Sequence, residues 1–434
     1  VVGAGLSGLA AIKQLADRSI PFDCFEIGEN IGGNWRYNNT NGRSPAYASL
    51  HIDTSKDRFA FGDLPMPEDW PAYLHHSQVL EYLETYADEF GLRQMVTYRH
   101  RVVSITQGDD GWQVVAVNVE SGESVTNLYG AVVVANGHHW DPNLPEEVDV
   151  FDGESIHASE YRIPDPYIGK DVLVVGVGNT GVDIASEVSW HAKSVTLSTR
   201  SGAHVLPRYV FGRPLDTLSN RRSSQLPLAV QRSLYKALLL AVRGRQSSYG
   251  FPEPEGPLLS QHPTVSQEVL RLVKDGHIEM RRGISRMTST GVIFADGDTE
   301  DFDAIIYATG YRISFPFLDD VSVVSSDNRI DLYKRIVPVD YPGLYFVGLI
   351  QPVGALPPLV EQQARWVAQR IDGAPLPTDG TMRAEIARDR EQVELQYQDR
   401  PRHTIQVDYW PYLDMMRNLC DEYDLAPNES AESV

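Results

Sequence analysis

The chain has 434 residues, of which 42% are hydrophobic and 22% charged, so it is long enough for about three folded units. Its 38 basic and 59 acidic side chains give a formal net charge of −21, which disfavours binding to nucleic acid. Only Cys24 and Cys420 are present as cysteines, and no apolar run reaches the about 20 residues that span a bilayer. We therefore expect a cytoplasmic globular protein without disulfides and without a nucleic-acid partner.

Two similar glycine motifs stand out, each between an apolar segment and a helical pattern. GAGLSG covers 3–8, and GVGNTG covers 176–181. Between a strand and a helix, GxGxxG predicts a tight turn at which backbone N–H groups hold the pyrophosphate of a dinucleotide. The nucleotide contacts expected from the motifs alone are Gly3, Gly5, Gly8, Gly176, Gly178, Asn179 and Gly181.

The charged residue at the end of the following strand distinguishes the two nucleotide sites. Glu26 lies 23 residues beyond Gly3, where a carboxylate accepts hydrogen bonds from ribose hydroxyls and rejects a 2′-phosphate. Arg200 lies 24 residues beyond Gly176, where a guanidinium pairs with a 2′-phosphate. The first site is therefore predicted to bind FAD and the second NADPH. The alternative is that both side chains are ordinary solvated charges at strand ends.

Two further apolar runs that end in glycine, 131–137 and 303–310, enclose the second motif. This order predicts an α/β fold with two Rossmann-like dinucleotide-binding domains, the NADP domain being inserted into the FAD domain. The expected divisions are 1–155 for the FAD domain, 156–300 for the NADP domain with an irregular insertion at 205–265, 301–375 for the return to the FAD domain, and 376–434 for a C-terminal arm and polar tail.

Inside the irregular insertion, apolar residues recur every four positions from Leu226 to Val242, with Arg232, Lys236 and Arg243 nearby. A basic amphipathic helix of this kind can lie on a membrane. It can also pack on the rest of the protein or line a substrate tunnel. The acidic charge of the whole chain favours this second interpretation.

The segment FDGESIHASEYR at 151–162 fits the pattern FxGxxxHxxx(Y/F). With this segment, the chain resembles the flavin-containing monooxygenases, within the class B flavoprotein monooxygenases, up to about Met416. The related Baeyer–Villiger pattern has tryptophan where Tyr161 stands. Further stretches similar to the family are 25–26, 32–35, 55–57, 137–139, 260–263, 308–311 and 348–352.

The resemblance implies a monooxygenase that uses NADPH, FAD and O₂. In this family a C4a-(hydro)peroxyflavin oxygenates a small nucleophilic substrate, an amine or a sulfide. The alternatives are an uncoupled NADPH oxidase, a Baeyer–Villiger-type monooxygenase and a redox-sensing flavoprotein without turnover. The resemblance also implies flavin contacts at Ala4, Leu6, Ser7, Asn34, Trp35, Thr54 and Gln363, and NADP contacts at Thr180, Gly181, Val182, Asp183 and Ser201. The alternative for Trp35 is packing in the core, and the alternative for Gln363 is a position on the surface of a helix.

Asp53 departs from the family, which typically carries asparagine at this point of a TNSSKE-like segment. An amide donates and accepts hydrogen bonds, whereas an ionised carboxylate only accepts them. At about 4 Å and an effective dielectric constant of about 20, a carboxylate would repel a developing peroxyflavin anion by roughly 4 kcal/mol. Asp53 is the expected catalytic residue, and three alternatives follow. Asp53 is protonated, or it is ionised and shortens the lifetime of the oxygenated flavin, or His51 has taken over its role.

The chain has no HExxH motif, no cysteine pair and no GxSxG motif, so no metal site is expected. The sequence does not identify the substrate. It also leaves open the oligomeric state, for which a homodimer is one possibility. The chain begins directly at the first glycine motif, so we expect that a natural N-terminal segment precedes it.

Overall fold

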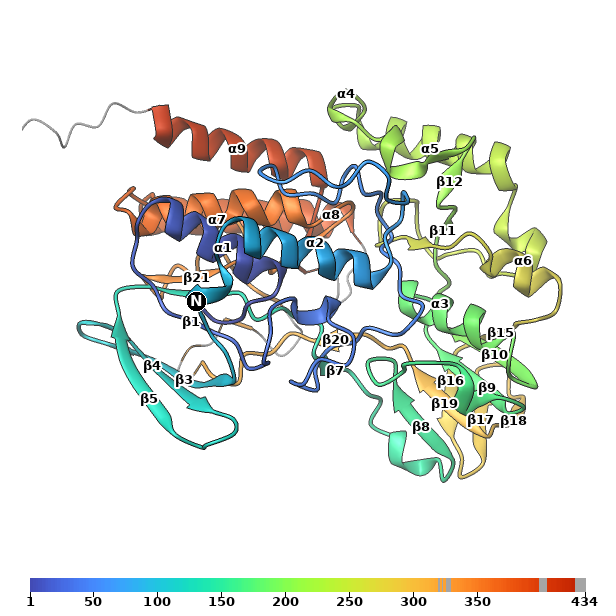
Figure 1. The fold of residues 1–434 in the computed structure, drawn as a ribbon. Helices are drawn as coiled ribbons and strands as arrows, with labels where there is room; N and C mark the ends of the chain where they lie inside the picture. The colour runs from blue at the N-terminus through green and yellow to red at the C-terminus, as the bar shows by residue number, and fades with distance from the viewer. Residues whose placement is uncertain (319–320, 322, 325–328, 398–403, 426–434) are drawn as a thin grey trace, which may run out of the picture.

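Two parallel β-sheets organise the chain, and each carries one of the glycine motifs (Figure 1). The computed structural model describes residues 1–318, 321, 323–324, 329–397 and 404–425. The sheets occupy opposite ends of the view in Figure 1, and helices pack against both of them. The predicted α/β class is confirmed.

The first sheet is centred on Val2, which forms parallel bridges to Phe25 on one side and to Val134 on the other. β1 (Cys24–Phe25) continues to β2 (Val96–Thr97), and β6 (Val132–Val134) continues to β21 (Leu344–Phe346). α1 (Leu6–Asp17) packs on α7 (Pro357–Ile371), which in turn packs on α9 (Tyr409–Leu425). Apolar residues of α1 and α7 form the core between these helices and the sheet.

Several further elements complete the first part of the fold. They are η1 (Gly33–Trp35), α2 (His76–Glu89), the antiparallel sheet of β3 (His100–Gly108), β4 (Gly111–Asn118) and β5 (Ser124–Tyr129), and the C-terminal elements β22 (Gln351–Pro352), α8 (Asp379–Gln396) and β23 (Gln406–Val407). β22 and β23 pair in parallel, so the segment after 376 is joined to the first part of the fold. The polar tail expected from 426 onward lies outside the described residues.

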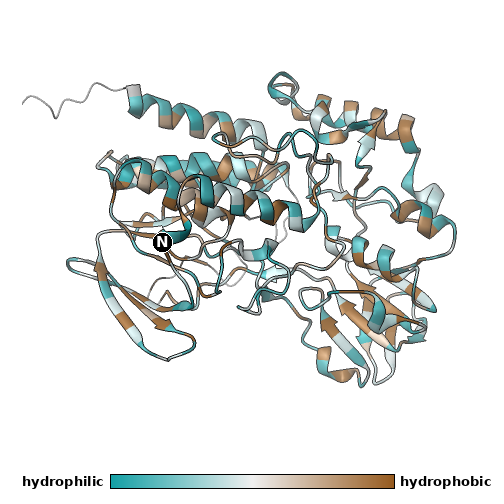
Figure 2. Ribbon diagram, in the orientation of Figure 1, coloured by the Kyte–Doolittle hydropathy of each residue, from teal (hydrophilic) through white to brown (hydrophobic). Residues whose placement is uncertain are grey.

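The second sheet has the parallel order β15–β10–β9–β19–β8. The two inner strands β9 and β19 are nearly continuous apolar runs, as is typical of strands covered on both faces, whereas the edge strand β15 carries three charged side chains. Figure 2 shows hydrophobic stretches in this part of the fold. The bounds are β8 (Glu154–His157), β9 (Asp171–Val175), β10 (Ser194–Thr199), β15 (Glu279–Arg282) and β19 (Ala304–Tyr307), with α3 (Asn179–Val188), α6 (Val269–Lys274) and the antiparallel β16 (Ile284–Met287), β17 (Gly291–Phe294) and β18 (Thr299–Asp301) beside them.

The second unit is inserted into the first, as the sequence predicts. The chain leaves the first sheet after β6, builds the second sheet, and returns to the first sheet at β21. The outgoing strand β7 (Asp141–Pro142) and the returning strand β20 (Tyr311–Arg312) pair with each other. The expected boundaries at 155 and 300 stay predictions. β8 spans position 155, and β19, which follows position 300, pairs between β9 and β8 in the second sheet.

The segment 205–265 is less irregular than expected. It contains the 16-residue helix α5 (Leu228–Arg243), in agreement with the amphipathic pattern. The other elements are short: β11 (Val205–Leu206), β12 (Tyr209–Val210), β13 (Arg213–Pro214), η5 (Leu215–Leu218), α4 (Arg221–Ser224), η6 (Gln246–Tyr249) and β14 (Thr264–Val265).

Candidate functional site

The first glycine motif turns so tightly that two of its positions exclude any side chain. Gly3 has φ +95°, and a Cβ placed on it would lie 2.9 Å from the carbonyl oxygen of Ala135. A Cβ on Gly8 would lie 1.9 Å from the carbonyl oxygen of Gly3. Only glycine therefore allows the start of α1 to lie this close to the end of β6.

The second motif repeats this geometry. Gly176 has φ +115°, with a virtual Cβ 2.4 Å from the carbonyl oxygen of Ala308, and a Cβ on Gly181 would lie 2.2 Å from the carbonyl oxygen of Gly176. Gly178 differs, because its φ is −71° and a Cβ there would have no described atom within 4 Å. No described side chain caps the N-terminus of α1 or α3. Both turns thus leave open N–H groups and space that fit a pyrophosphate.

Glu26, directly after β1, is buried with its carboxylate against the first turn. Its Oε2 accepts a hydrogen bond of 2.8 Å from the N–H of Ala4, and its Oε1 accepts one of 2.8 Å from the N–H of Gly28. Burial raises the pKa of Glu26, and these N–H donors oppose that rise. Each oxygen keeps a second lone pair, so Glu26 can still accept from ribose hydroxyls.

Arg200 follows β10 and is exposed. Among the described residues its side chain has no hydrogen bond or ion pair, so the guanidinium is available to an anion. The N–H of Gly202 donates to Oγ1 of Thr199 over 3.0 Å and fixes the turn that carries Arg200 and Ser201. This arrangement fits the expected contact with a 2′-phosphate.

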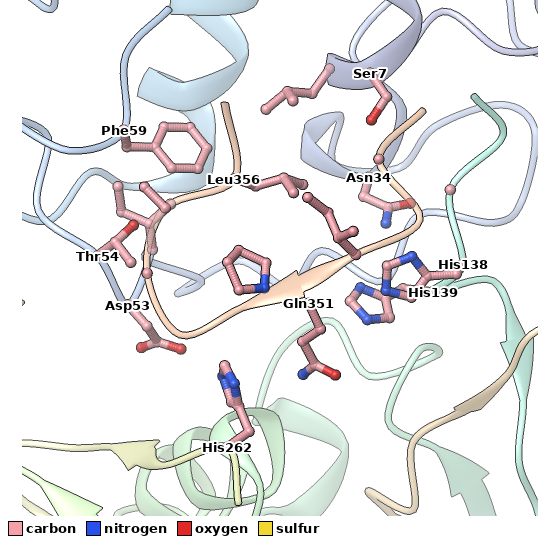
Figure 3. A pocket seen from close by; sticks show the side chains of 18 of the residues that line it. Ser7, Asn34, Asp53, Thr54, Phe59, His138, His139, His262, Gln351 and Leu356 are labelled. Carbon is pink, nitrogen blue, oxygen red and sulfur yellow. The ribbon is translucent and has the colours of Figure 1, made fainter. Parts of the chain in front are cut away.

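A cavity of about 780 Å³ lies at the carboxyl ends of the strands of the first sheet and reaches the segment 205–265 (Figure 3). In parallel α/β sheets this edge is where ligands bind. Figure 3 shows Asp53 and Thr54 on one side of the cavity and His138 and His139 on the other. The predicted site residues that line it are Gly3, Gly5, Leu6, Ser7, Glu26, Asn34, Trp35, Asp53, Thr54 and Asn179.

Other predicted residues lie in the two turns without lining this cavity. Ala4, Gly8, Gly181 and Val182 are buried where the helices begin. Gly176, Gly178, Thr180, Asp183, Arg200 and Ser201 belong to the second turn or to the end of β10, beyond the described lining.

The expected flavin contact of Gln363 stays a prediction, and its side chain lies outside the lining of the described cavity. Its side chain is fully buried between α7 and α9 and does not line the cavity. Its Oε1 accepts from the N–H of Gly348 over 2.8 Å, and its Nε2 donates to the hydroxyl of Tyr412 over 2.6 Å. Gln363 therefore fixes the backbone at Gly348 from within the core. This backbone lies close to the first glycine turn, because a virtual Cβ on Gly348 would lie 2.0 Å from Oγ of Ser7.

Asp53 belongs to a charged cluster that the sequence does not reveal. Nη2 of Arg208 lies 3.6 Å from Oδ1 of Asp53 and 3.9 Å from Oδ2 of Asp183, and the hydroxyl of Tyr47 donates to that same Oδ2 over 3.0 Å. Burial, and after it the neighbouring charge of Asp183, raise the pKa of Asp53 to about 8 against the opposing effect of Arg208. Burial likewise raises the pKa of Asp183. We call these four residues the Asp53 cluster.

Two histidines form the opposite wall of the cavity. Burial lowers the pKa of His139 to about 4, and burial followed by the neighbouring His139 lowers the pKa of His138. Both imidazoles are therefore neutral at physiological pH, so each can donate and accept a hydrogen bond. The sequence predicts no role for this pair. Its signals are the position after a buried strand that ends in glycine and the similarity of 137–139 to the family.

The described residues contain no helix that is both long and apolar enough to cross a lipid bilayer.

Comparisons with known proteins agree on one family. The family model described as "Flavin-binding monooxygenase-like" matches residues 1–427. Flavin-containing monooxygenase 5 of Rattus norvegicus is 38% identical over 99% of this chain and 83% of its own length. Dimethylaniline monooxygenase [N-oxide-forming] 2 of the same organism is 37% identical over 95% of this chain and 81% of its own length.

Solved structures share the fold. S-allyl-L-cysteine S-oxygenase from Allium sativum superposes with a TM-score of 0.72 at 25% identity, covering 97% of this chain and 87% of that one. Closed cyclohexanone monooxygenase superposes with a TM-score of 0.73 at 19% identity, covering 97% of each chain. The two-domain architecture derived above is thus the architecture of flavin monooxygenases.

Proposed function

Because the chain belongs to the flavin-containing monooxygenase family, we propose that it binds FAD at the first glycine turn and NADPH at the second, and that it uses O₂ to oxygenate an amine or a sulfide. The observation that carries the proposal is the pair of sterically matched glycine turns, one of which opens into the cavity. The chain itself is a flavin monooxygenase, and the proposal concerns its cofactors and substrates.

The first turn supplies the contacts for FAD. The N–H groups at the start of α1 would hold the pyrophosphate, and Glu26 would hold the adenosine ribose. Asn34 and Trp35, which line the cavity from η1, would border the ring system. When bound and reduced by NADPH, the flavin would activate O₂, and one of the two oxygen atoms of O₂ would reach the substrate.

The second turn supplies the contacts for NADPH. Gly178 leaves space at the N-terminus of α3, and Arg200 lies exposed at the end of the next strand. Asp183, within α3, joins this turn to the cavity through Arg208 and Asp53. The proposal therefore assigns the Asp53 cluster to the contact between the two nucleotide sites.

Asp53 can hold a proton at the cavity wall. Its raised pKa favours the neutral acid at pH 7, and a neutral carboxyl donates a hydrogen bond as an amide does. Of the three alternatives for Asp53 that the sequence leaves open, this supports the one in which Asp53 is protonated and donates a hydrogen bond. Protonation also removes the charge that would repel a developing anion in the cavity.

The nature of the substrate is supported by the relatives and by the cavity. One relative is named for N-oxide formation and one structural neighbour for S-oxygenation. The cavity wall that the segment 205–265 forms is mostly apolar, which suits a soft, weakly hydrated nucleophile. Its residues from the segment 205–265 include Leu215, Leu226, Leu228, Tyr235, Leu258 and Leu259.

The test measures NADPH consumption and product formation with a panel of tertiary amines, thioethers and ketones. The proposal expects oxygenated product in proportion to NADPH for an amine or a thioether. NADPH consumption that yields only H₂O₂ for every compound would favour the uncoupled oxidase. An ionised Asp53 would explain that result, because its charge would repel a developing peroxyflavin anion. Turnover confined to ketones would favour the Baeyer–Villiger alternative.

A further inference from the structure

The carboxylates in the wall of the cavity differ in their partners. Among the described residues, those that line it are Glu26, Asp53, Asp216 and Asp408. Backbone N–H groups donate to Glu26, and two side chains donate to Asp408. Asp53 has the guanidinium of Arg208 beside it. Each of these three carboxylates has a donor or a cation from the protein itself, and Asp216 is the one that differs.

Asp216 has an oxygen without a donor. It lies in η5, and its Oδ2 accepts a hydrogen bond of 2.6 Å from the N–H of Ser55. Its Oδ1 is buried and has no hydrogen-bond partner among the described residues. Residues 205–245 contain eight basic side chains and Asp216 as their one acidic side chain, yet none of the eight forms an ion pair with it in the part of the chain that the structure describes. A buried acceptor without a donor is costly, so a bound molecule that supplies a donor is favoured here.

Three tyrosines lie near this carboxylate. Tyr73, Tyr235 and Tyr409 line the cavity, and burial raises the pKa of each. The negative charge of Asp216 contributes to all three rises, so the carboxylate lies within electrostatic reach of the three hydroxyl groups. An ammonium group is attracted both by a carboxylate and by the faces of aromatic rings.

Arg58, a cationic side chain in this part of the lining, is already engaged. Its Nη2 donates to the carbonyl oxygen of Ser219 over 2.9 Å, and its guanidinium lies over the ring of Trp410, 4.8 Å from the ring centroid. Among the described residues it forms no ion pair with Asp216. Arg58 therefore does not take the place of a ligand cation at this carboxylate.

We propose that Asp216 is a specificity-determining residue, which binds a protonated amine of the substrate that is separate from the nitrogen or sulfur atom to be oxygenated. This inference rests on the proposed function and deepens it. The reacting atom needs a free lone pair, so the ammonium group must be a second group of the substrate. Ser55, which donates to Asp216, is two positions after Asp53. Because two positions of an extended chain span at most about 7 Å, only a few carbon atoms would separate the ammonium group from the reacting atom.

The experiment compares two thioethers of equal length, 3-(methylthio)propylamine and 3-(methylthio)propan-1-ol. At neutral pH the first carries an ammonium group and the second a neutral hydroxyl, whereas the sulfur atom is the same. Asp216→Asn keeps an acceptor for the N–H of Ser55 but removes the charge. It should raise the KM for the amine about tenfold or more and the KM for the alcohol less than about twofold, with kcat unchanged for both. Asp216→Glu keeps the charge and should keep part of the preference for the amine.

Asp408→Asn is the matched control, because it removes another carboxylate from the lining. It should leave the ratio of the two KM values unchanged. A second measurement needs no turnover: in calorimetric titration without NADPH, the Kd of n-butylammonium should rise about tenfold in Asp216→Asn, whereas that of butan-1-ol should stay the same. Unchanged Tm and flavin content show that each variant is folded.

Equal changes for the charged and the neutral compounds, or no change for either, would overturn the proposal. A wild type that binds n-butylammonium no better than butan-1-ol would overturn it without any variant. If neither thioether is oxygenated while n-butylammonium still binds through Asp216, the proposed function fails and the cation site stands.

Discussion

The guanidinium of Arg208 lies 3.6 Å from the carboxylate of Asp53, and this contact joins the inserted unit to the wall of the cavity in the first unit. Asp183 approaches the same guanidinium to 3.9 Å, so two half-buried carboxylates share one cation. Oδ1 of Asp53 has no hydrogen-bond partner among the described residues. The excess negative charge and the missing donor both favour a proton on the pair.

Asp53→Asn should stabilise the protein, and more so at alkaline pH. The folded-state pKa of Asp53 is raised to about 8, above the about 3.9 of an unfolded chain. Its contribution to stability is therefore complete below about pH 4 and is lost as the pH rises through about 8. An amide has no such loss, so the Tm of the variant should exceed that of the wild type by more at about pH 8.5 than at about pH 5.

The control for this prediction is Asp57→Asn, four positions along the chain, where the carboxylate is exposed. Its Tm difference from the wild type should be small at both values of pH. A Tm difference for Asp53→Asn that does not change with pH would show that Asp53 titrates normally in the folded protein.

Arg208→Gln should destabilise the protein, because it leaves two carboxylates in one half-buried site without their cation. Removing one partner of a fully buried ion pair costs about 3 kcal/mol or more, so a smaller loss is expected here, and it should shrink at acid pH as Asp53 and Asp183 take up protons. Arg208→Lys keeps the charge and should recover much of the stability. Denaturant unfolding at several values of pH measures this, and an equal loss for Gln and Lys would indicate that packing on Tyr73 matters more than charge.

Two alanine substitutions in the second glycine turn should separate folding from nucleotide binding. A Cβ on Gly181 would lie 2.2 Å from a backbone carbonyl, so Gly181→Ala should lower the Tm markedly. A Cβ on Gly178 has no described atom within 4 Å and an ordinary φ, so Gly178→Ala should keep the Tm. Its methyl group would fill the space left for the pyrophosphate, and the Kd for NADPH in fluorescence titration should rise. If Gly178→Ala binds NADPH as the wild type does, the pyrophosphate does not pass over this turn.

The sequence predicts both glycine turns because their steric requirement is local. Gly3 and Gly8 are five positions apart, and a Cβ on Gly8 would meet the carbonyl oxygen of Gly3 within the turn itself. The positive φ of Gly3 belongs to the same turn, although its Cβ would meet Ala135 of the neighbouring strand. The following strand can be as short as the two residues of β1 and still place Glu26 correctly, since the offset along the chain is fixed by the intervening helix. The fold class and the two glycine turns can therefore be predicted from the sequence alone.

The Asp53 cluster is not readable in this way, because its members are brought together only by the packing of the inserted unit on the first. Asp53 and Arg208 are 155 positions apart, and Arg208 stands in a segment without a periodic pattern. The surroundings of Gln363 also depend on packing between distant parts of the chain. The sequence does not show that α9 covers this side chain of α7. It also does not show that the amide of Gln363 accepts a hydrogen bond from Gly348 and donates one to Tyr412. The place of β19 in the second sheet likewise depends on pairing between strands that are far apart in the sequence.

Arg200→Ala should remove most of the preference for NADPH over NADH. The guanidinium is exposed and unpaired among the described residues, so its loss should affect the 2′-phosphate contact and not the fold. A charge-assisted contact contributes roughly 1.5–3 kcal/mol, which corresponds to about a 10- to 150-fold rise in KM for NADPH. Arg286→Ala, an exposed arginine of β16, serves as the control. An unchanged NADPH/NADH ratio of kcat/KM would mean that another residue contacts the phosphate.

Asp53 should also set the pH at which NADPH consumption yields product instead of H₂O₂. The carboxyl lines the cavity, and its raised pKa of about 8 keeps it protonated, and able to donate, at neutral pH. As the pH rises through about 8, the donor is lost and a negative charge appears beside the reacting region. The ratio of oxygenated product to H₂O₂ in the wild type should therefore fall over this range. Asp53→Asn keeps a donor at every pH, so its ratio should stay level, and Asp57→Asn should follow the wild type. A fall of equal size in wild type and Asp53→Asn would place the titrating group elsewhere, and identical ratios at all pH values would exclude Asp53 from the oxygen chemistry.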